Sequence, residues 1–170
     1  MNPMSEFLIV PFNYASHHNA VQKLVRPWEV QHLINRAPPP PAWLGVYQPP
    51  FAERVAQWLR EQFDSRLLSY QSDPSGFDVW SSPALTLRRR TGDCEDLTLL
   101  VVSIFLAGGA SARVAIGSLP GGGHAWVEGA DAHGGFLLEA TSGELHRYQR
   151  PADYNLFYHI DPNPSLMRAA

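Results

Sequence analysis

The longest apolar run of the sequence lies near its middle and predicts a buried helix. From Asp93 to Ala107, nearly every residue after Asp96 is apolar, and the run is too long for a usual strand. Two glycines, 108 and 109, follow it and supply the left-handed stop that helices prefer. Because the run is apolar on every side, we expect it to be the central helix. Asp93 suits the N-cap, and Asp96 can lean back toward the free amides.

Weaker patterns precede the central run. Residues 17–36 look helical although Pro27 lies inside them, and residues 50–63 carry apolar side chains at helical spacing. The proline-rich stretch 37–43 should be extended and stiff. Residues 69–83 are rich in turn-forming residues and predict irregular structure.

In the second half of the chain, apolar and polar residues alternate as they do in β-strands. Four segments, 112–119, 124–129, 135–141 and 156–160, predict consecutive antiparallel strands. Helices that come first and a sheet that follows favour the α+β class. At 170 residues we expect one domain over 1–170, with an N-terminal helical or extended portion, 1–68, and a core over 69–161.

Composition and charge narrow the functional classes. No stretch approaches the ~20 apolar residues that span a bilayer, and the N-terminus lacks the basic start of a signal peptide. One cysteine cannot form an internal disulfide, which agrees with a soluble, cytoplasmic protein. The net charge of −3 and the pI of 6.1 give no general footprint for nucleic acid. The three arginines 88–90 are interpreted as a solvated face, with substrate steering or pairing to nearby acids as the alternatives. The oligomeric state has no signal in the sequence.

The single cysteine stands at the start of the predicted central helix. Cys94 lies between Asp93 and Glu95, and Asp96 comes next. Free amides at a helix start stabilise a thiolate and can donate to an oxyanion, whereas nearby carboxylates raise the pKa of a thiol. A histidine cation or a bound cation would reconcile the two effects. The alternative is a small buried core cysteine without a chemical role.

Among seven histidines, His124 stands out because it opens a predicted strand directly after three glycines. Closing the next hairpin on a four-residue loop, 130–133, places His124 directly opposite Glu139. Cross-strand partners have β-carbons about 4.5 to 5.5 Å apart, so this carboxylate can orient the imidazole as in a nucleophile, base and acid triad. A purely structural contact is the alternative. The remaining histidines are interpreted as structural or solvated: His17, His18, His32, His133, His146 and His159.

The segment from Asp78 to Thr141 resembles the transglutaminase-like cysteine peptidase superfamily. The resemblance is carried by "GDCED" at 92–96 together with "HAW" at 124–126. It implies a papain-like core in which a buried helix packs on an antiparallel sheet. It also implies roles for three residues: Cys94 as nucleophile, His124 as general base and acid, and Glu139 as orienting carboxylate, where aspartate is the more usual residue.

The words "DVWSSP" at 78–83 look most like the bacterial transglutaminase-like cysteine proteinases, some of which depend on calcium. Acids beside the cysteine contribute to the metal site in those enzymes. This implies calcium ligation by Asp93 and Glu95, with Asp96 as a further candidate, and oxygen ligands are what calcium prefers. The alternative is that Asp93 caps the helix and the other two carboxylates are solvated.

Two tryptophans, Trp80 and Trp126, are candidates for donating to an oxyanion or lining the substrate groove; the alternative, which is the more common role for both, is a packed core aromatic. The resemblance implies a cysteine-dependent amide hydrolase, a peptidase or amidase, that acts on a peptide or protein through a thioester. No cofactor besides calcium is implied. A transglutaminase-type acyl transferase and a non-catalytic peptide-binding module on the same fold remain as alternatives.

Overall fold

A computed structural model of the chain describes residues 5–9, 18–35 and 49–162. The proline-rich stretch 37–43 and His17 lie outside the described residues. The helices are α1 His18–Gln22, α2 Pro27–Asn35, α3 Phe51–Asp64, α4 Pro83–Arg89 and α5 Cys94–Ala107. The strands are β1 Phe7–Ile9, β2 Ser69–Tyr70, β3 Val79–Ser81, β4 Thr91–Gly92, β5 Ser111–Leu119, β6 Gly122–Asp131, β7 Gly134–Glu139, β8 Glu144–Arg147 and β9 Asn155–Ile160.

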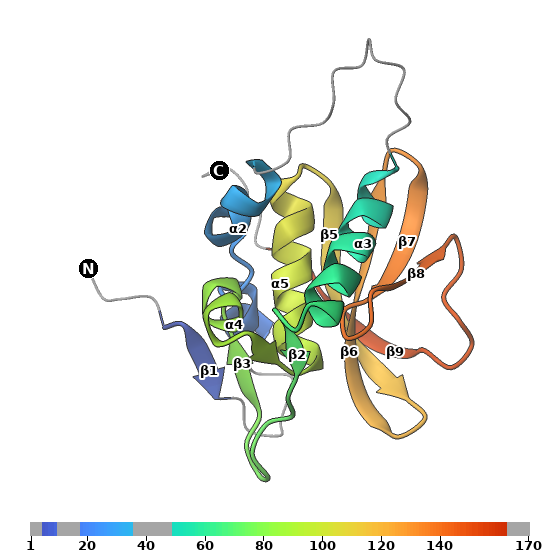
Figure 1. Cartoon of the computed structure of the whole chain (residues 1–170). Helices are drawn as coiled ribbons and strands as arrows, with labels where there is room; N and C mark the ends of the chain where they lie inside the picture. The colour runs from blue at the N-terminus through green and yellow to red at the C-terminus, as the bar shows by residue number, and fades with distance from the viewer. Residues whose placement is uncertain (1–4, 10–17, 36–48, 163–170) are drawn as a thin grey trace.

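Helix α5 is the buried centre of the molecule, as its apolar run predicts. It packs against the large sheet and against α2, α3 and α4 (Figure 1). The Oδ1 atom of Asp93 accepts from the amides of Glu95 and Asp96 at 3.2 and 3.3 Å, so the predicted N-cap is confirmed. The prediction for the Asp96 side chain is wrong, because its Oδ1 atom accepts the amide of Ser81 in β3 at 2.6 Å. A long-range partner therefore replaces the local cap.

The five long strands form one antiparallel sheet in the order β8-β7-β6-β5-β9. Successive side chains of each strand point to opposite sides, so the sheet has two faces. The inner face belongs to the main core with α5 and includes Ala125, Val127 and Leu138. The outer face buries a smaller cluster around Trp126 and Leu137, against which Tyr154 packs. The fold is thus α+β, with the central helix on an antiparallel sheet.

Several local expectations are corrected by the structure. The described residues of this segment, 18–35, form two helices, because Pro27, which lacks an N–H, stands at the first position of α2 where no donor is needed. The stretch 69–83 contains β3, which pairs with the N-terminal strand β1. It also contains the start of α4, which Ser82 caps by accepting the amide of Leu85 at 3.4 Å. Strand β8 was not predicted at all.

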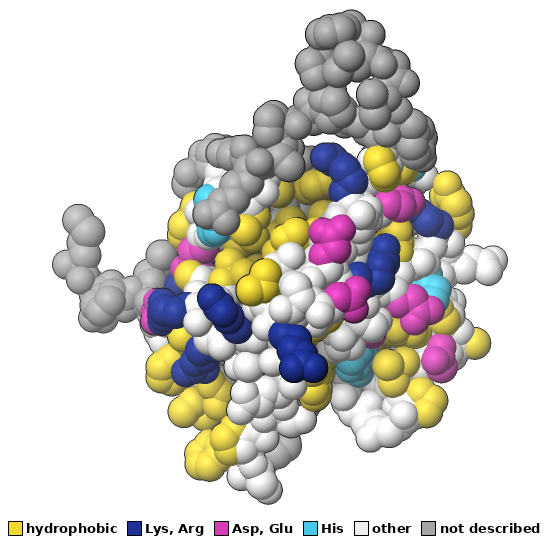
Figure 2. Space-filling model, in the orientation of Figure 1, with side chains coloured by type: hydrophobic (Ala, Val, Ile, Leu, Met, Phe, Trp, Pro, Cys, Tyr) yellow, Lys and Arg dark blue, Asp and Glu magenta, His cyan; other side chains and the backbone are white. Residues whose placement is uncertain are grey.

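Charged side chains of both signs are interspersed on the face shown in Figure 2. Within the basic run at 88–90, Arg88 pairs with Glu6 of the N-terminal segment at 2.7 Å, and Arg90 ends α4 in a left-handed conformation. The run therefore ties the N-terminal segment to α4. None of the helices in the described part of the chain has the length and apolar character that a membrane span requires.

An ion-pair cluster fastens α3 to the hairpin between β6 and β7. Arg147 in β8 lies 2.9 Å from Asp131 and 2.5 Å from Glu53 in α3. Asp131 also accepts the amide of Ala52, in the first turn of α3, at 3.1 Å. The bond from Arg147 lowers the pKa of Asp131 from its usual 3.8 to about 2, which marks the carboxylate as stabilised in the folded state.

We expect Asp131→Asn to lower the free energy of unfolding at neutral pH by about 1–3 kcal/mol, because Arg147 and the α3 amide lose a charged acceptor. Since the folded-state pKa of Asp131 is depressed, this stabilisation is present above pH 3.8 and is lost as the pH falls toward 2. Urea unfolding at several pH values measures both effects. Asp153→Asn, at an exposed loop position, is the control. A difference between wild type and Asp131→Asn that stays constant down to pH 2 would contradict the assignment.

Candidate active site

Cys94 is the first residue of α5 and is 7% exposed. The strand–cap–helix connection before it is tight, because a β-carbon at Gly92 would stand 2.7 Å from the β-carbon of Asp96. Glycine at 92 therefore lets β4 run directly into the cap at Asp93. The thiol is fixed at the helix start by this close approach.

The surroundings of the thiol favour its protonated form. Its Sγ atom donates to Oε2 of Glu95 at 3.0 Å. Burial, the charge of Glu95 and this hydrogen bond raise the pKa of Cys94, while the backbone N–H of Ala125 in β6 acts in the opposite direction. This contact places the sulfur beside Ala125, the residue that directly follows His124. The expectation that carboxylates oppose thiolate formation is met.

Of the carboxylates at the helix start, Asp93 and Asp96 are buried and Glu95 is half-buried. Burial, followed by the charge of Asp93, raises the pKa of Glu95 to about 8 and that of Asp96 to about 7. Burial also raises the pKa of Asp93. The start of α5 thus carries more carboxyl groups than it can keep ionised at neutral pH without a nearby cation.

His124 and Glu139 meet, but not in the predicted register. The β6–β7 hairpin closes on two residues, and the ladder pairs Asp131 with Gly134 and ends at Val127 with Leu138. His124 and Glu139 are therefore diagonal neighbours. A slip of two residues keeps a side chain on its own face, so Nε2 of His124 still lies 2.8 Å from Oε2 of Glu139.

Glu139 is 6% exposed and fully engaged by hydrogen bonds. Its Oε1 atom accepts from the amide and the hydroxyl of Thr141 at 3.0 and 2.7 Å. Its Oε2 atom accepts from the hydroxyl of Tyr154 at 3.0 Å in addition to the bond with His124. Burial acts to raise the pKa of Glu139, but the bonds from His124 and Thr141 outweigh it and lower the pKa. Sequence reasoning missed Thr141 and Tyr154, and only the spacing of Thr141, two residues after the glutamate, was a local signal.

A cavity of about 390 Å³ opens beside these groups. Its lining brings His124 together with Asp93 and Glu95, and also includes Trp80 and two exposed phenylalanines, 77 and 157. Trp80 is 2% exposed, and among the described residues its indole Nε1 has no hydrogen-bond partner. Trp80 thus lines this cavity and carries a buried donor that has no partner among the described residues.

Trp126 and His159 both contact Glu128. The ring of Trp126 is stacked on His124 with centroids 6.3 Å apart, and its indole N–H donates to Glu128 at 3.0 Å. Glu128 also lies 2.9 Å from Nε2 of His159. Trp126 therefore serves the packing beneath His124, and its N–H is already used.

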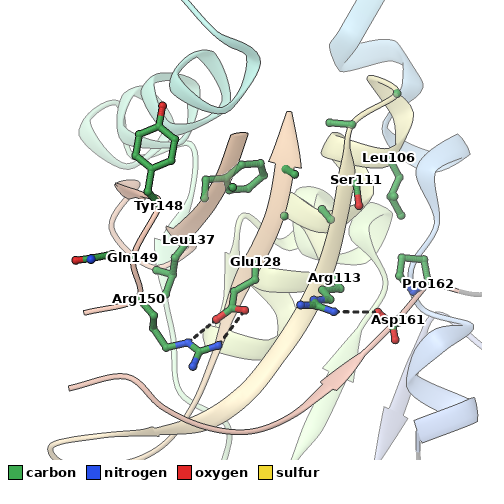
Figure 3. Close-up of a pocket in the computed structure, with 17 residues that line it drawn as sticks. Leu106, Ser111, Arg113, Glu128, Leu137, Tyr148, Gln149, Arg150, Asp161 and Pro162 are labelled. Carbon is green, nitrogen blue, oxygen red and sulfur yellow. Dashed lines mark hydrogen bonds and ion pairs between the residues drawn. The ribbon is translucent and has the colours of Figure 1, made fainter. Parts of the chain in front are cut away.

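A larger groove, of about 710 Å³, lies elsewhere and contains none of the three candidate catalytic residues. Its charged side chains pair with one another, Glu128 with Arg150 at 2.7 Å and Arg113 with Asp161 at 3.9 Å (Figure 3). The smaller cavity is lined by His124, whereas Cys94 and Glu139 lie outside its lining. Because it also borders the start of α5 at Asp93 and Glu95, we take it as the candidate active site.

Comparison with known proteins shows the family to which the chain belongs. The sequence model of the transglutaminase-like superfamily matches residues 47–138, more than half of the chain. The chain belongs to the transglutaminase-like superfamily. The matched range includes Cys94 and His124 and ends one residue before Glu139. No curated protein matches the sequence.

Solved structures similar to this member of the superfamily include the following three. LapG from Legionella pneumophila has 15% identity and a TM-score of 0.56, covering 89% of this chain and 96% of its own. An EGTA-treated LapG has 16% identity and a TM-score of 0.55, covering 85% and 81%. A proposed cysteine protease from Cytophaga hutchinsonii has 14% identity and a TM-score of 0.56, covering 90% and 53%. At these identities the likeness shows the shared fold.

The described residues include no group of three or more His, Cys, Asp or Glu side chains placed to hold a metal ion. Asp93 and Glu95 face the same cavity as a pair. Asp96 does not line this cavity, and its Oδ1 atom accepts the amide of Ser81 in β3. Asp73 and Asp78 also line this cavity, so the carboxylates near a cation would not be limited to Asp93 and Glu95.

The contact between Glu139 and Tyr154 predicts a change in tyrosine titration. Burial and the charge of Glu139 raise the pKa of Tyr154, so Glu139→Gln should lower it toward 10.0. Tyrosinate absorbance after rapid pH jumps measures the latest-titrating tyrosine before the chain unfolds at high pH. That component should be missing from Tyr154→Phe, which is the control. Identical curves for wild type and Glu139→Gln would exclude the contact.

Proposed function

We propose that the chain is a cysteine-dependent amide hydrolase, a peptidase or amidase, with Cys94, His124 and Glu139 as its catalytic residues. The observation that carries the proposal is the His124–Glu139 hydrogen bond of 2.8 Å. His124 lies on β6 directly before Ala125, whose backbone amide acts on the sulfur of Cys94. Membership of the superfamily and the fold shared with a proposed cysteine protease support it.

His124 is the base and acid of the proposed reaction. Because Nε2 faces the ionised Glu139, the neutral ring carries its proton there and keeps a lone pair on Nδ1. The Cys94 thiol, which donates to Glu95 in the resting structure, turns to Nδ1 and gives up its proton there, and the sulfur forms a bond to the carbonyl carbon of the substrate. His124 then gives that proton to the departing amine as the C–N bond breaks. Water then adds to the thioester carbon while His124 accepts its proton, the C–S bond breaks to release the carboxylic acid, and His124 returns the proton to the sulfur.

Two donors suit the oxyanion formed in each addition step. The amides of Glu95 and Asp96 already donate to Asp93, so the helix-start amide left for this role is that of Cys94 itself. The unpartnered indole N–H of Trp80, in the cavity wall, is the second. A backbone amide and a side-chain donor form a suitable oxyanion hole.

Transfer of the acyl group to an amine instead of water is the alternative reaction, and the residues above would serve it unchanged. Product analysis with and without an added primary amine separates the two. A non-catalytic module that binds a peptide in the same cavity is the alternative from another class, and the raised pKa of Cys94 is the observation in its favour.

We also propose that Asp93 and Glu95 hold a calcium ion. An oxygen-only pair that faces one cavity and is too crowded to stay ionised suits a hard dication, and waters or carbonyls would supply the remaining ligands. The EGTA treatment of one similar LapG structure agrees with a calcium role in that protein. When bound, the ion would neutralise the carboxylates that raise the pKa of the thiol.

We expect His124→Ala to slow alkylation of Cys94 by iodoacetamide near neutral pH by roughly tenfold or more, because the thiol loses its proton acceptor. Mass spectrometry reports the labelling without ambiguity, since the chain has one cysteine. His159→Ala, which removes a histidine bound to Glu128 on the outer face, is the matched control. Equal rates in wild type and His124→Ala would favour the binding module.

For calcium, the expected result is a rise in melting temperature when calcium replaces EGTA, because an ion bound to the folded state stabilises it. Glu95→Gln should abolish the rise. Glu61→Gln, at an exposed position of α3, should retain it. A wild type without any shift, or an undiminished shift in Glu95→Gln, would remove calcium from this site.

A further inference from the structure

Tyr154 shares an acceptor atom with the proposed catalytic histidine. Its hydroxyl lies 3.0 Å from Oε2 of Glu139, and Nε2 of His124 lies 2.8 Å from that same oxygen. The tyrosine ring stands edge-on to Trp126, with centroids 5.1 Å apart and an interplanar angle of 80°. Since Trp126 is fully buried and stacked on His124, the packing that holds the imidazole also holds the tyrosine.

We propose that Tyr154 is a positioning residue of this site, which donates to Glu139 and limits the negative charge that Glu139 presents to His124. The inference rests on the function proposed above. A hydrogen bond to an ionised carboxylate stabilises its charge, and a carboxylate stabilised in this way is a weaker acceptor for a second donor. His124 is thereby oriented without being locked into a permanent ion pair, as a group that must both take and give a proton requires.

The carboxylate keeps its place without the tyrosine, because Thr141 holds the other oxygen with two donors. The effect of the Tyr154 hydroxyl on charge is therefore separable from its effect on geometry. Removing it should strengthen the His124–Glu139 bond, not break it.

The charged groups around the pair favour a donating hydroxyl. Tyr154 is faced by Glu144 of β8 and its neighbour Asp153, as well as by Glu139, and burial together with these charges raises its pKa. The ring of His146, also in β8, lies 6.2 Å from it. On its other side His124 shares the cavity with Asp93 and Glu95. Tyr154 consequently stays a hydroxyl, and can donate, throughout the neutral range.

The test compares Tyr154→Phe with Tyr148→Phe in the full chain by NMR. Tyr148 is a matched control, because its hydroxyl donates to the carbonyl of His133 at the hairpin turn, away from the site. The signal measured is the Nε2–H proton of His124, which a carboxylate acceptor moves downfield. We expect it to move further downfield in Tyr154→Phe and to keep its wild-type position in Tyr148→Phe. An unchanged or upfield position in a folded Tyr154→Phe overturns the proposal.

A second measurement keeps the hydroxyl in place and serves if Tyr154→Phe does not fold. With 3-fluorotyrosine placed at position 154 alone, the hydroxyl is a stronger donor, so the same proton signal should move upfield, and no movement overturns the proposal. Neither readout needs turnover. Failure of the proposed enzyme activity, shown by Cys94 labelling that ignores His124→Ala, is therefore distinguishable from failure of this inference.

Discussion

Burial of one carboxylate, Glu139, is the constraint that organises the outer face of the sheet. A carboxylate that is 6% exposed must have its oxygens satisfied by donors, and here four N–H or O–H groups do so. They come from β6, from the turn after β7, and from the segment before β9. Glu139 therefore joins three parts of the chain and sets where His124 and Tyr154 stand.

At the start of α5 the situation is reversed: carboxyl groups are many and hydrogen-bond donors are few. Asp93, Glu95 and Asp96 bring three carboxyl groups to one helix turn, and their donors are few, so burial raises the pKa of each. One half of the candidate site is rich in donors around a single negative charge, and the other is rich in carboxylates around a neutral thiol. Proton transfer from the sulfur to His124 would move positive charge toward Glu139 and leave negative charge beside Glu95. The second of these is the costly part, which is why a cation at the helix start and donors for the oxyanion matter to the proposed chemistry.

Local signals predicted much of this arrangement. The apolar run and the glycines behind it are sufficient for α5, and the cap at Asp93 needs nothing beyond its own first turn. The pairing of His124 with Glu139 survived an error in the hairpin loop, because a two-residue slip leaves both side chains on one face. Tyr154 could not be found in this way, since its contact with Glu139 depends on how the chain returns between β8 and β9. Asp96 was misassigned for the same reason: a local cap and a distant amide of β3 compete for one carboxylate, and sequence spacing shows only the first.

The observed register also gives a physical reason for glutamate at position 139. If the β6–β7 ladder were continued beyond Val127 and Leu138, His124 would face Thr141 and Glu139 would face Trp126. Diagonal neighbours in antiparallel strands are about 7–8 Å apart at their α-carbons, farther than directly opposed residues. The additional methylene of glutamate offsets part of this distance, and Thr141, at the opposed position, is free to hold the carboxylate from behind. Residue type and register are thus linked: aspartate at 139 would need the directly opposed register, which would in turn displace Thr141 from the oxygen that it now binds.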